Sequence, residues 1–130
     1  MEFEYTTKVN RLRDRLSDFM NKHIRPAEET FREHMAHTDK PWSTHPVYEP
    51  LKQKAQSSGL WNLFLNDKDH GAGLTNLEYA PLAEIMGQVW WSSEIFNCNA
   101  PDSGNMETLY QYGSKSQKAT GLEPLLAGKI

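Results

Sequence analysis

The chain has 130 residues, with 14 Lys and Arg against 17 Asp and Glu, a formal net charge of −3 and one cysteine. The charges are dispersed, so neither a nucleic-acid surface nor a polybasic membrane arm is expected. The apolar runs are far shorter than the roughly 20 residues that span a bilayer, and the start of the chain carries no signal-peptide pattern. A single Cys98 cannot form an internal disulfide, so we expect a soluble, intracellular protein.

The first half of the chain predicts two helices. From Thr7 the apolar residues recur at three- and four-residue steps, which is the spacing of one helix face; they are Val9, Leu12, Leu16, Phe19, Met20 and Ile24. Pro26 is expected to kink or restart this helix, because proline lacks an N–H and its ring crowds the preceding turn. A second helix is predicted from about Pro46 to Ser58.

An irregular apolar segment from Leu60 to Leu65 and a Gly-rich loop follow Gly59, which closes the second helix. Gly71 and Gly73 are expected to permit positive φ. The sequence Thr-Asn-Leu-Glu at 75–78 is a capping box, which predicts a third helix starting near Asn76.

The last third of the chain predicts further helices. Asp102 is expected to cap a helix after the break at Pro101, and this helix is expected to end at Gly113. A second capping box at 114–117 opens the last helix, in which Gly121 costs about 1 kcal/mol relative to alanine. The fold class is therefore predicted to be all-α, a bundle of four to six helices with one irregular apolar segment and a Gly-rich loop.

Several motifs together resemble the N-terminal helical domain of the acyl-CoA dehydrogenase family, over nearly the whole chain. They are Gly-Leu-Trp at 59–61, Leu-Ala-Glu-Ile-Met-Gly at 82–87, Tyr-Gly-Ser at 112–114 with Gln-Lys at 117–118, and Leu-Glu-Pro-Leu-Leu-Ala-Gly at 122–128. Residues 97, 100–102, 104–107 and 122–126 look most like the long-chain members that oxidise 4-hydroxyacyl-CoAs and like their bacterial homologues.

The resemblance implies that residues 1–130 are the N-terminal domain of an FAD-dependent enzyme, without the central β-domain and the C-terminal helical domain. It implies α,β-dehydrogenation of an acyl-CoA, electron transfer to an electron-transfer flavoprotein, and a homo-oligomeric complete enzyme. The catalytic glutamate is expected beyond Ile130, so this chain alone is expected to bind no FAD and to be inactive. The compartment implied is the cytoplasm in bacteria, or the mitochondrion or peroxisome in eukaryotes.

The positions that correspond to the floor of the family's acyl pocket are Phe96, Asn97, Ala100 and Gly104. The small residues Ala100 and Gly104 leave room for additional methylenes, each worth about 0.8 kcal/mol when buried, which favours long acyl chains. The alternative is that Phe96 is ordinary core and that Gly104 only relieves close helix packing.

Other candidate sites are less well supported by their spacing. His34, His37 and His45 with Asp39 lack the ligand spacing of a zinc site, so no metal is expected. Cys98 has no neighbouring histidine, and the glycines at 71 and 73 belong to no known phosphate-binding motif.

Four tryptophans form a further group, and one of the adjacent pair Trp90 and Trp91 is a candidate for contact with another domain or subunit. Trp61 and Trp90 are expected in the core, and Trp42 is expected to cover its own loop. The rival function is a non-catalytic helical binding module that uses exposed apolar faces to bind a partner or lipid.

Overall fold

The computed structural model describes residues 4–40 and 43–130, and every regular element in these ranges is helical. Five helices there have ten or more residues, which confirms the predicted all-α class. The α-helices are α1 (Thr7–Phe19), α2 (Glu28–His37), α3 (Tyr48–Ser57), α4 (Asn76–Met86), α5 (Ser92–Ile95), α6 (Asp102–Tyr112), α7 (Lys115–Gln117) and α8 (Glu123–Leu126). None of the helices in the described ranges is long and apolar enough to cross a membrane.

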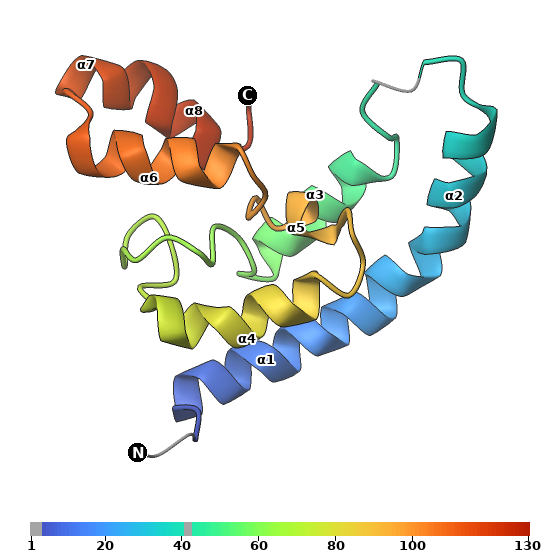
Figure 1. The fold of residues 1–130 in the computed structure, drawn as a ribbon, viewed down its shortest axis with the longest axis horizontal. Helices are drawn as coiled ribbons and strands as arrows, with labels where there is room; N and C mark the ends of the chain where they lie inside the picture. Colours follow the sequence, from blue (N-terminus) through green and yellow to red (C-terminus); the bar gives the residue numbers. More distant parts are fainter. Residues whose placement is uncertain (1–3, 41–42) are drawn as a thin grey trace.

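The long N-terminal rod in Figure 1 runs from α1 to α2 without a break at Pro26. A π-helical turn, η1 (Met20–Ile24), and a 3₁₀ turn, η2 (Arg25–Ala27), join the two helices. In the π turn the Arg25 N–H bonds to the Met20 carbonyl, five residues back. The chain therefore accommodates Pro26 by changing the spacing of its backbone hydrogen bonds. The predicted kink or restart is a π turn followed by a 3₁₀ turn, after which α2 begins.

The capping boxes begin α4 and α7 as the sequence predicts. The Thr75 hydroxyl accepts from the Glu78 N–H at 3.3 Å, and the Glu78 carboxylate accepts from the Thr75 N–H at 3.0 Å. The second box pairs Ser114 with Gln117 in the same way. After this box the helix passes into a second π turn, η3 (Lys118–Leu122), before α8.

The prediction that Asp102 caps α6 is wrong. Pro101 occupies the cap position, and no side chain there accepts a backbone hydrogen bond. Asp102 is instead the first helical residue, where its negative charge still lies at the positive end of the helix dipole. Gly113 ends α6 as expected, with an extended φ of −66° rather than a left-handed one.

The glycines of the loop act in two ways. Gly73 has a φ of +58°, which confirms the expectation for this residue, while the expectation of positive φ at Gly71 is wrong. Gly59, which follows α3, has a φ of +63°. A Cβ on Gly71 would lie 2.2 Å from the carbonyl oxygen of Leu65, so the loop needs a glycine there for close approach.

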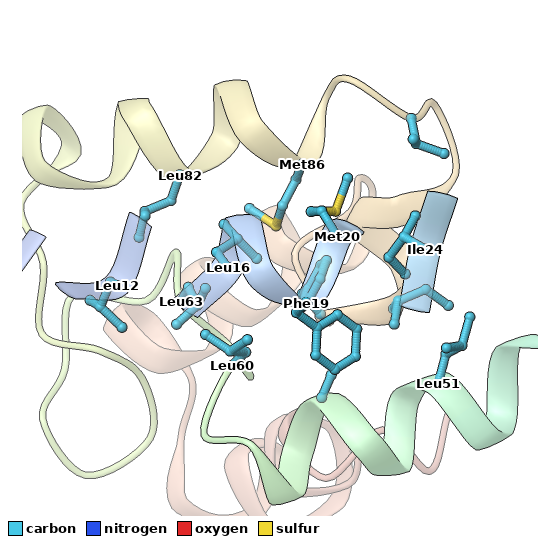
Figure 2. Close-up of a cluster of buried hydrophobic side chains, with 14 of the residues drawn as sticks. Leu12, Leu16, Phe19, Met20, Ile24, Leu51, Leu60, Leu63, Leu82 and Met86 are labelled. Atoms are coloured by element: carbon cyan, nitrogen blue, oxygen red, sulfur yellow. The ribbon is translucent and has the colours of Figure 1, made fainter. Parts of the chain in front are cut away.

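Two hydrophobic clusters make up the interior. The larger cluster lies between α1, η1, α3, α4 and α5. Figure 2 shows its side chains converging, among them Leu16, Phe19, Leu63 and Met86. The smaller cluster joins α6, η3 and α8 to the end of the irregular segment; its buried members are Phe64, Leu65, Met106, Leu122 and Leu126. Residues 60–65 form no regular element, which confirms the irregular apolar segment, and they contribute side chains to both clusters.

The expectation that Trp90 packs in the core is wrong. Its side chain is 77% exposed, whereas that of Trp91 is 4% exposed and stacks on Phe31 with ring centroids 4.9 Å apart. Adjacent residues in a helical turn point in different directions, so the pair divides between interior and surface. Trp61 is half-buried against the larger cluster, and Trp42 lies outside the described residues.

We predict that Phe96→Ala lowers the free energy of unfolding by about 3–5 kcal/mol, because it removes a fully buried ring from the larger cluster. Trp90→Ala is the matched control, since it deletes a larger ring that is mostly exposed, and it should change the free energy by less than about 1 kcal/mol. Urea unfolding of the two variants measures the difference. Equal losses of stability in the two variants would contradict the surface position of Trp90.

Candidate functional site

The four residues predicted to line a pocket fall around the junction of α5 and α6. Phe96 is fully buried, and its ring packs edge-on against Phe19 with centroids 5.3 Å apart. Asn97 is buried as well and has a left-handed φ of +53°. These two side chains point into the domain.

Ala100 and Gly104 lie on the outside of the same junction. Both are exposed, and a Cβ built on Gly104 meets no atom within 4 Å. The structure thus separates the four residues into two buried and two exposed ones, and it does not gather them around one closed cavity. Gly104 does not relieve a close helix contact within the described residues, because the space beside it is open.

Asn97 belongs to a buried polar network with Asn62, which sequence reasoning missed. The Asn97 amide donates to the Asn62 Oδ1 at 2.7 Å and to the Leu125 carbonyl at 2.9 Å. The Asn62 amide donates to the carbonyls of Leu126 at 3.0 Å and His70 at 3.2 Å. Asn62 also has a φ of +53°, and an asparagine inside an apolar run was the available sign of such a turn.

A hollow of about 570 Å³ opens beside Asn97, between the end of α2, the turn before α3, α5 and the last residues of the chain. Its walls combine apolar side chains such as Phe31 and Trp90 with polar groups. Among the latter is an ion pair between Lys52 and Glu94, whose side chains are 20% and 28% exposed. The volume falls within the range of ligand pockets, but the pair neutralises itself and provides no free charge.

His45 is the titratable group buried in this wall. Its Nδ1 accepts from the Val47 N–H at 3.0 Å, and its Nε2 is buried without a hydrogen-bond partner in the described residues. Burial and the nearby His34 lower the pKa of His45 below its usual 6.5, while the Thr30 carbonyl opposes the shift without reaching hydrogen-bond geometry. The folded structure therefore favours a neutral imidazole at this position.

A second polar cluster fastens the Gly-rich loop to α6. The Tyr110 hydroxyl donates to Asp67 Oδ2 at 2.6 Å, and the His70 Nδ1 lies 2.7 Å from Asp67 Oδ1. These hydrogen bonds, that of Tyr110 foremost, lower the pKa of Asp67 to about 2. A carboxylate, an imidazole and a phenol converge here, and the carboxylate is hydrogen-bonded to both of the others. The cluster therefore holds the loop against α6.

The loop around Gly71 and Gly73 does not fit the phosphates of a flavin dinucleotide. The Gly71 N–H donates to the Asp67 carbonyl at 3.1 Å, and the Gly73 N–H donates to the Leu65 carbonyl at 3.4 Å. The N–H groups of Asp69 and His70 are bonded to the Asp67 side chain. A phosphate-binding loop needs such donors to be free, so the loop is a turn that leads into α4.

The described ranges contain neither a metal-binding cluster nor a reactive thiol. No three His, Cys, Asp or Glu side chains lie together in a way that could hold a metal ion. Burial raises the pKa of the Cys98 thiol to about 11, which keeps it protonated near neutral pH.

Comparison with known proteins gives one consistent family. Residues 6–129 match the family model described as acyl-CoA dehydrogenase, N-terminal domain. The chain is 50% identical over 127 residues to acyl-CoA dehydrogenase family member 10 of Mus musculus, covering 94% of this chain and 12% of that protein. It is 47% identical over 135 residues to the probable acyl-CoA dehydrogenase FadE2 of Mycobacterium tuberculosis, covering 100% of this chain and 32% of that protein.

A solved structure of a Mycobacterium abscessus protein, assigned to the acyl-CoA dehydrogenases, has the same fold as this chain. The TM-score is 0.93 at 43% sequence identity, over 98% of this chain and 33% of that chain. The described chain therefore spans a third or less of the length of these three similar proteins.

We predict that Asn97→Ala lowers the free energy of unfolding by about 1–3 kcal/mol, because it leaves the buried Asn62 Oδ1 without a donor. It also removes one of the two donors of the Leu125 carbonyl, which keeps its hydrogen bond from the Gly128 N–H. Asn105→Ala on the exposed side of α6 is the control and should change the free energy of unfolding by no more than about 0.5 kcal/mol. Denaturant titration compares the two. Comparable effects would show that the network contributes little.

We predict that stability falls as pH drops below 6.5, in part because of His45. The folded state lowers its pKa from that value, so between the two pKa values the unfolded chain binds more protons. The His45 contribution is complete above pH 6.5 and is lost as pH falls toward the folded pKa.

His45→Gln removes this titration, and its free energy of unfolding should change less than that of the parent chain between about pH 7 and about pH 5. His37→Gln, an exposed position at the end of α2, is the control and should keep the parent slope. An unchanged slope in His45→Gln would exclude His45 as the titrating group.

Proposed function

The chain belongs to the acyl-CoA dehydrogenase family, and we propose that residues 1–130 are the N-terminal helical domain of an enzyme that dehydrogenates an acyl-CoA between Cα and Cβ. In this proposal the domain forms part of the pocket for the acyl chain. The complete enzyme adds a β-domain and a second helical domain, in keeping with the greater length of the relatives. It uses an FAD held outside these residues, since the glycine loop leaves no donors for its phosphates.

The observation that carries the pocket proposal is the open space at the start of α6. Ala100 and Gly104 stand at the surface with no side chain of the described domain covering Gly104. A neighbouring domain can pack near this surface and still leave room for the distal methylenes of an acyl chain. Phe96 and Asn97 support the surface from behind, because they anchor the turn between α5 and α6.

Exposed apolar side chains favour a domain of a larger enzyme over an independent binding module. Leu77 is 84% exposed, Trp90 77% and Tyr112 81%, and they lie on or next to different helices. A module with one docking face would gather such residues in one patch, whereas a domain with several neighbours distributes them. This distribution is also consistent with contacts to a second subunit in a homo-oligomer.

The chemistry of the proposed enzyme lies outside this chain. By family resemblance, a glutamate beyond Ile130 would take the α-proton, and a bound FAD would supply the acceptor for the hydride that leaves the β-carbon. Electrons then pass to an electron-transfer flavoprotein. The residues described here bind and orient the acyl chain and exclude water from its distal end, and the small residues at 100 and 104 favour long chains.

We predict that Gly104→Leu in the complete enzyme lowers kcat/KM for long acyl-CoAs by roughly 5- to 150-fold and spares short ones. The added side chain fills space that distal methylenes would occupy, at an overpacking cost of about 1–3 kcal/mol for long substrates alone. Stability should not fall, because nothing in the domain lies within 4 Å of the new Cβ.

Asn105→Leu is the matched control, since it places the same side chain about 100° around α6. It should leave the ratio of long- to short-chain kcat/KM unchanged. Equal losses for both chain lengths in Gly104→Leu, or the same selectivity change in Asn105→Leu, would overturn the assignment of Gly104 to the pocket.

A further inference from the structure

A basic groove lies between α1 and the loop that follows α3, and none of the four acyl-pocket residues lines it. Its volume is about 430 Å³. It is lined by Thr7, Lys8, Arg11, Leu12, Arg15, Gly59, Trp61, Leu63, Gly71 and Ala72. Neither the acyl-pocket proposal nor the two polar clusters makes use of the cations of this groove.

The three cations of the groove come from one face of α1. Lys8, Arg11 and Arg15 are three and four residues apart, which brings their side chains onto the same side of the helix. The outer two are held by backbone acceptors: the Lys8 Nζ donates to the Ala72 carbonyl at 2.6 Å, and an Arg15 N–H donates to the Ser58 carbonyl. Arg11 stands between them, is exposed, and makes no hydrogen bond or ion pair within residues 4–40 and 43–130.

The charge of the groove is unusual for this chain. Three cations and no carboxylate line it, although the chain as a whole carries a net charge of −3. Hydrogen bonds from the Thr75 N–H and hydroxyl lower the pKa of the nearby Glu78 carboxylate, and the charge of Lys8 lowers it further. Glu78 therefore keeps its negative charge near Lys8, and the remaining positive charge of the groove comes from Arg11 and Arg15.

The floor of the groove is preformed and partly apolar. Buried Leu12 and Leu63 and half-buried Trp61 provide carbon surface beside the cations. Gly59 and Gly71 bring backbone close on the other side, and their conformation and packing exclude larger side chains there. The Lys8 and Arg15 tethers hold both ends of this backbone against α1, so little ordering is needed on binding.

We propose that this groove binds a small ligand through a phosphate group, with Arg11 as its central contact. A guanidinium presents paired N–H donors that match two phosphate oxygens. Lys8 and Arg15 keep further N–H groups beyond those given to the backbone, and their charges add to the attraction. The apolar floor would accept a carbon portion attached to the phosphate. This site is separate from the acyl pocket and does not depend on the proposed reaction.

Inorganic pyrophosphate is the probe, titrated into the full chain by isothermal calorimetry at low and at high salt. We expect saturable binding that weakens as salt rises, because the contact is largely electrostatic. Arg11→Gln should weaken it by about tenfold or more, as expected for the loss of a charge-assisted contact. Lys8→Gln should weaken it as well, and circular dichroism checks that each variant retains its helices.

Arg13→Gln is the matched control. It removes the same charge from the same helix, but Arg13 lies on another face, where it contacts the Tyr5 ring and the Asn10 side chain. Binding in this variant should stay within about twofold of the parent, since only the long-range field changes. No saturable binding to the parent chain, or equal weakening by Arg11→Gln and Arg13→Gln, would overturn the site.

Discussion

The hydrogen bond between the Asn97 amide and the Asn62 Oδ1, 2.7 Å long and buried, joins the two hydrophobic clusters. Leu60 and Leu63 on either side of Asn62 belong to the larger cluster, and the next residues, Phe64 and Leu65, belong to the smaller one. Asn97 follows Phe96 of the larger cluster. Both amides also donate to carbonyls at the end of α8. These hydrogen bonds fix the C-terminal helices, from α6 to α8, to the rest of the domain. A buried amide or its acceptor is costly to leave unpaired, so the two asparagines favour this one arrangement of the two clusters.

A π turn precedes both Pro26 and Pro124 and lets the helix continue past each proline. η1 (Met20–Ile24) ends two residues before Pro26, and η3 (Lys118–Leu122) ends two residues before Pro124. A proline gives no N–H and crowds the carbonyl of the preceding turn, and a π turn widens the helix where that crowding falls. Gly121 lies in the second π turn, where a Cβ would be 3.2 Å from Leu109, so the glycine allows η3 to approach α6.

The sequence was sufficient for features that depend on neighbouring residues. The boxes at 75–78 and 114–117 and the amphipathic face from Val9 to Ile24 need only local spacing, and all are present. Features set by tertiary packing were not accessible. Which of Trp90 and Trp91 is buried depends on the position of Phe31, about sixty residues earlier, and the αL turn at Asn62 becomes favourable only when the carbonyls of α8 are in place. The exposed positions of Ala100 and Gly104 follow from the same long-range packing.

The Gly-rich loop is held from two sides by side chains that lie far apart in the sequence, on α1 and on α6. From α1, Lys8 donates to the Ala72 carbonyl; from α6, Tyr110 donates to Asp67. The loop has no regular structure. These two contacts therefore hold it in place, together with the hydrogen bond from the Asn62 amide to the His70 carbonyl. Because one contact reaches α1 and the other α6, the loop connects the basic groove to the helix that carries the open surface at Gly104. One irregular segment thus helps to position two separate surfaces. Its glycines make this conformation possible, because Gly73 has a φ of +58° and a Cβ on Gly71 would lie 2.2 Å from the Leu65 carbonyl oxygen.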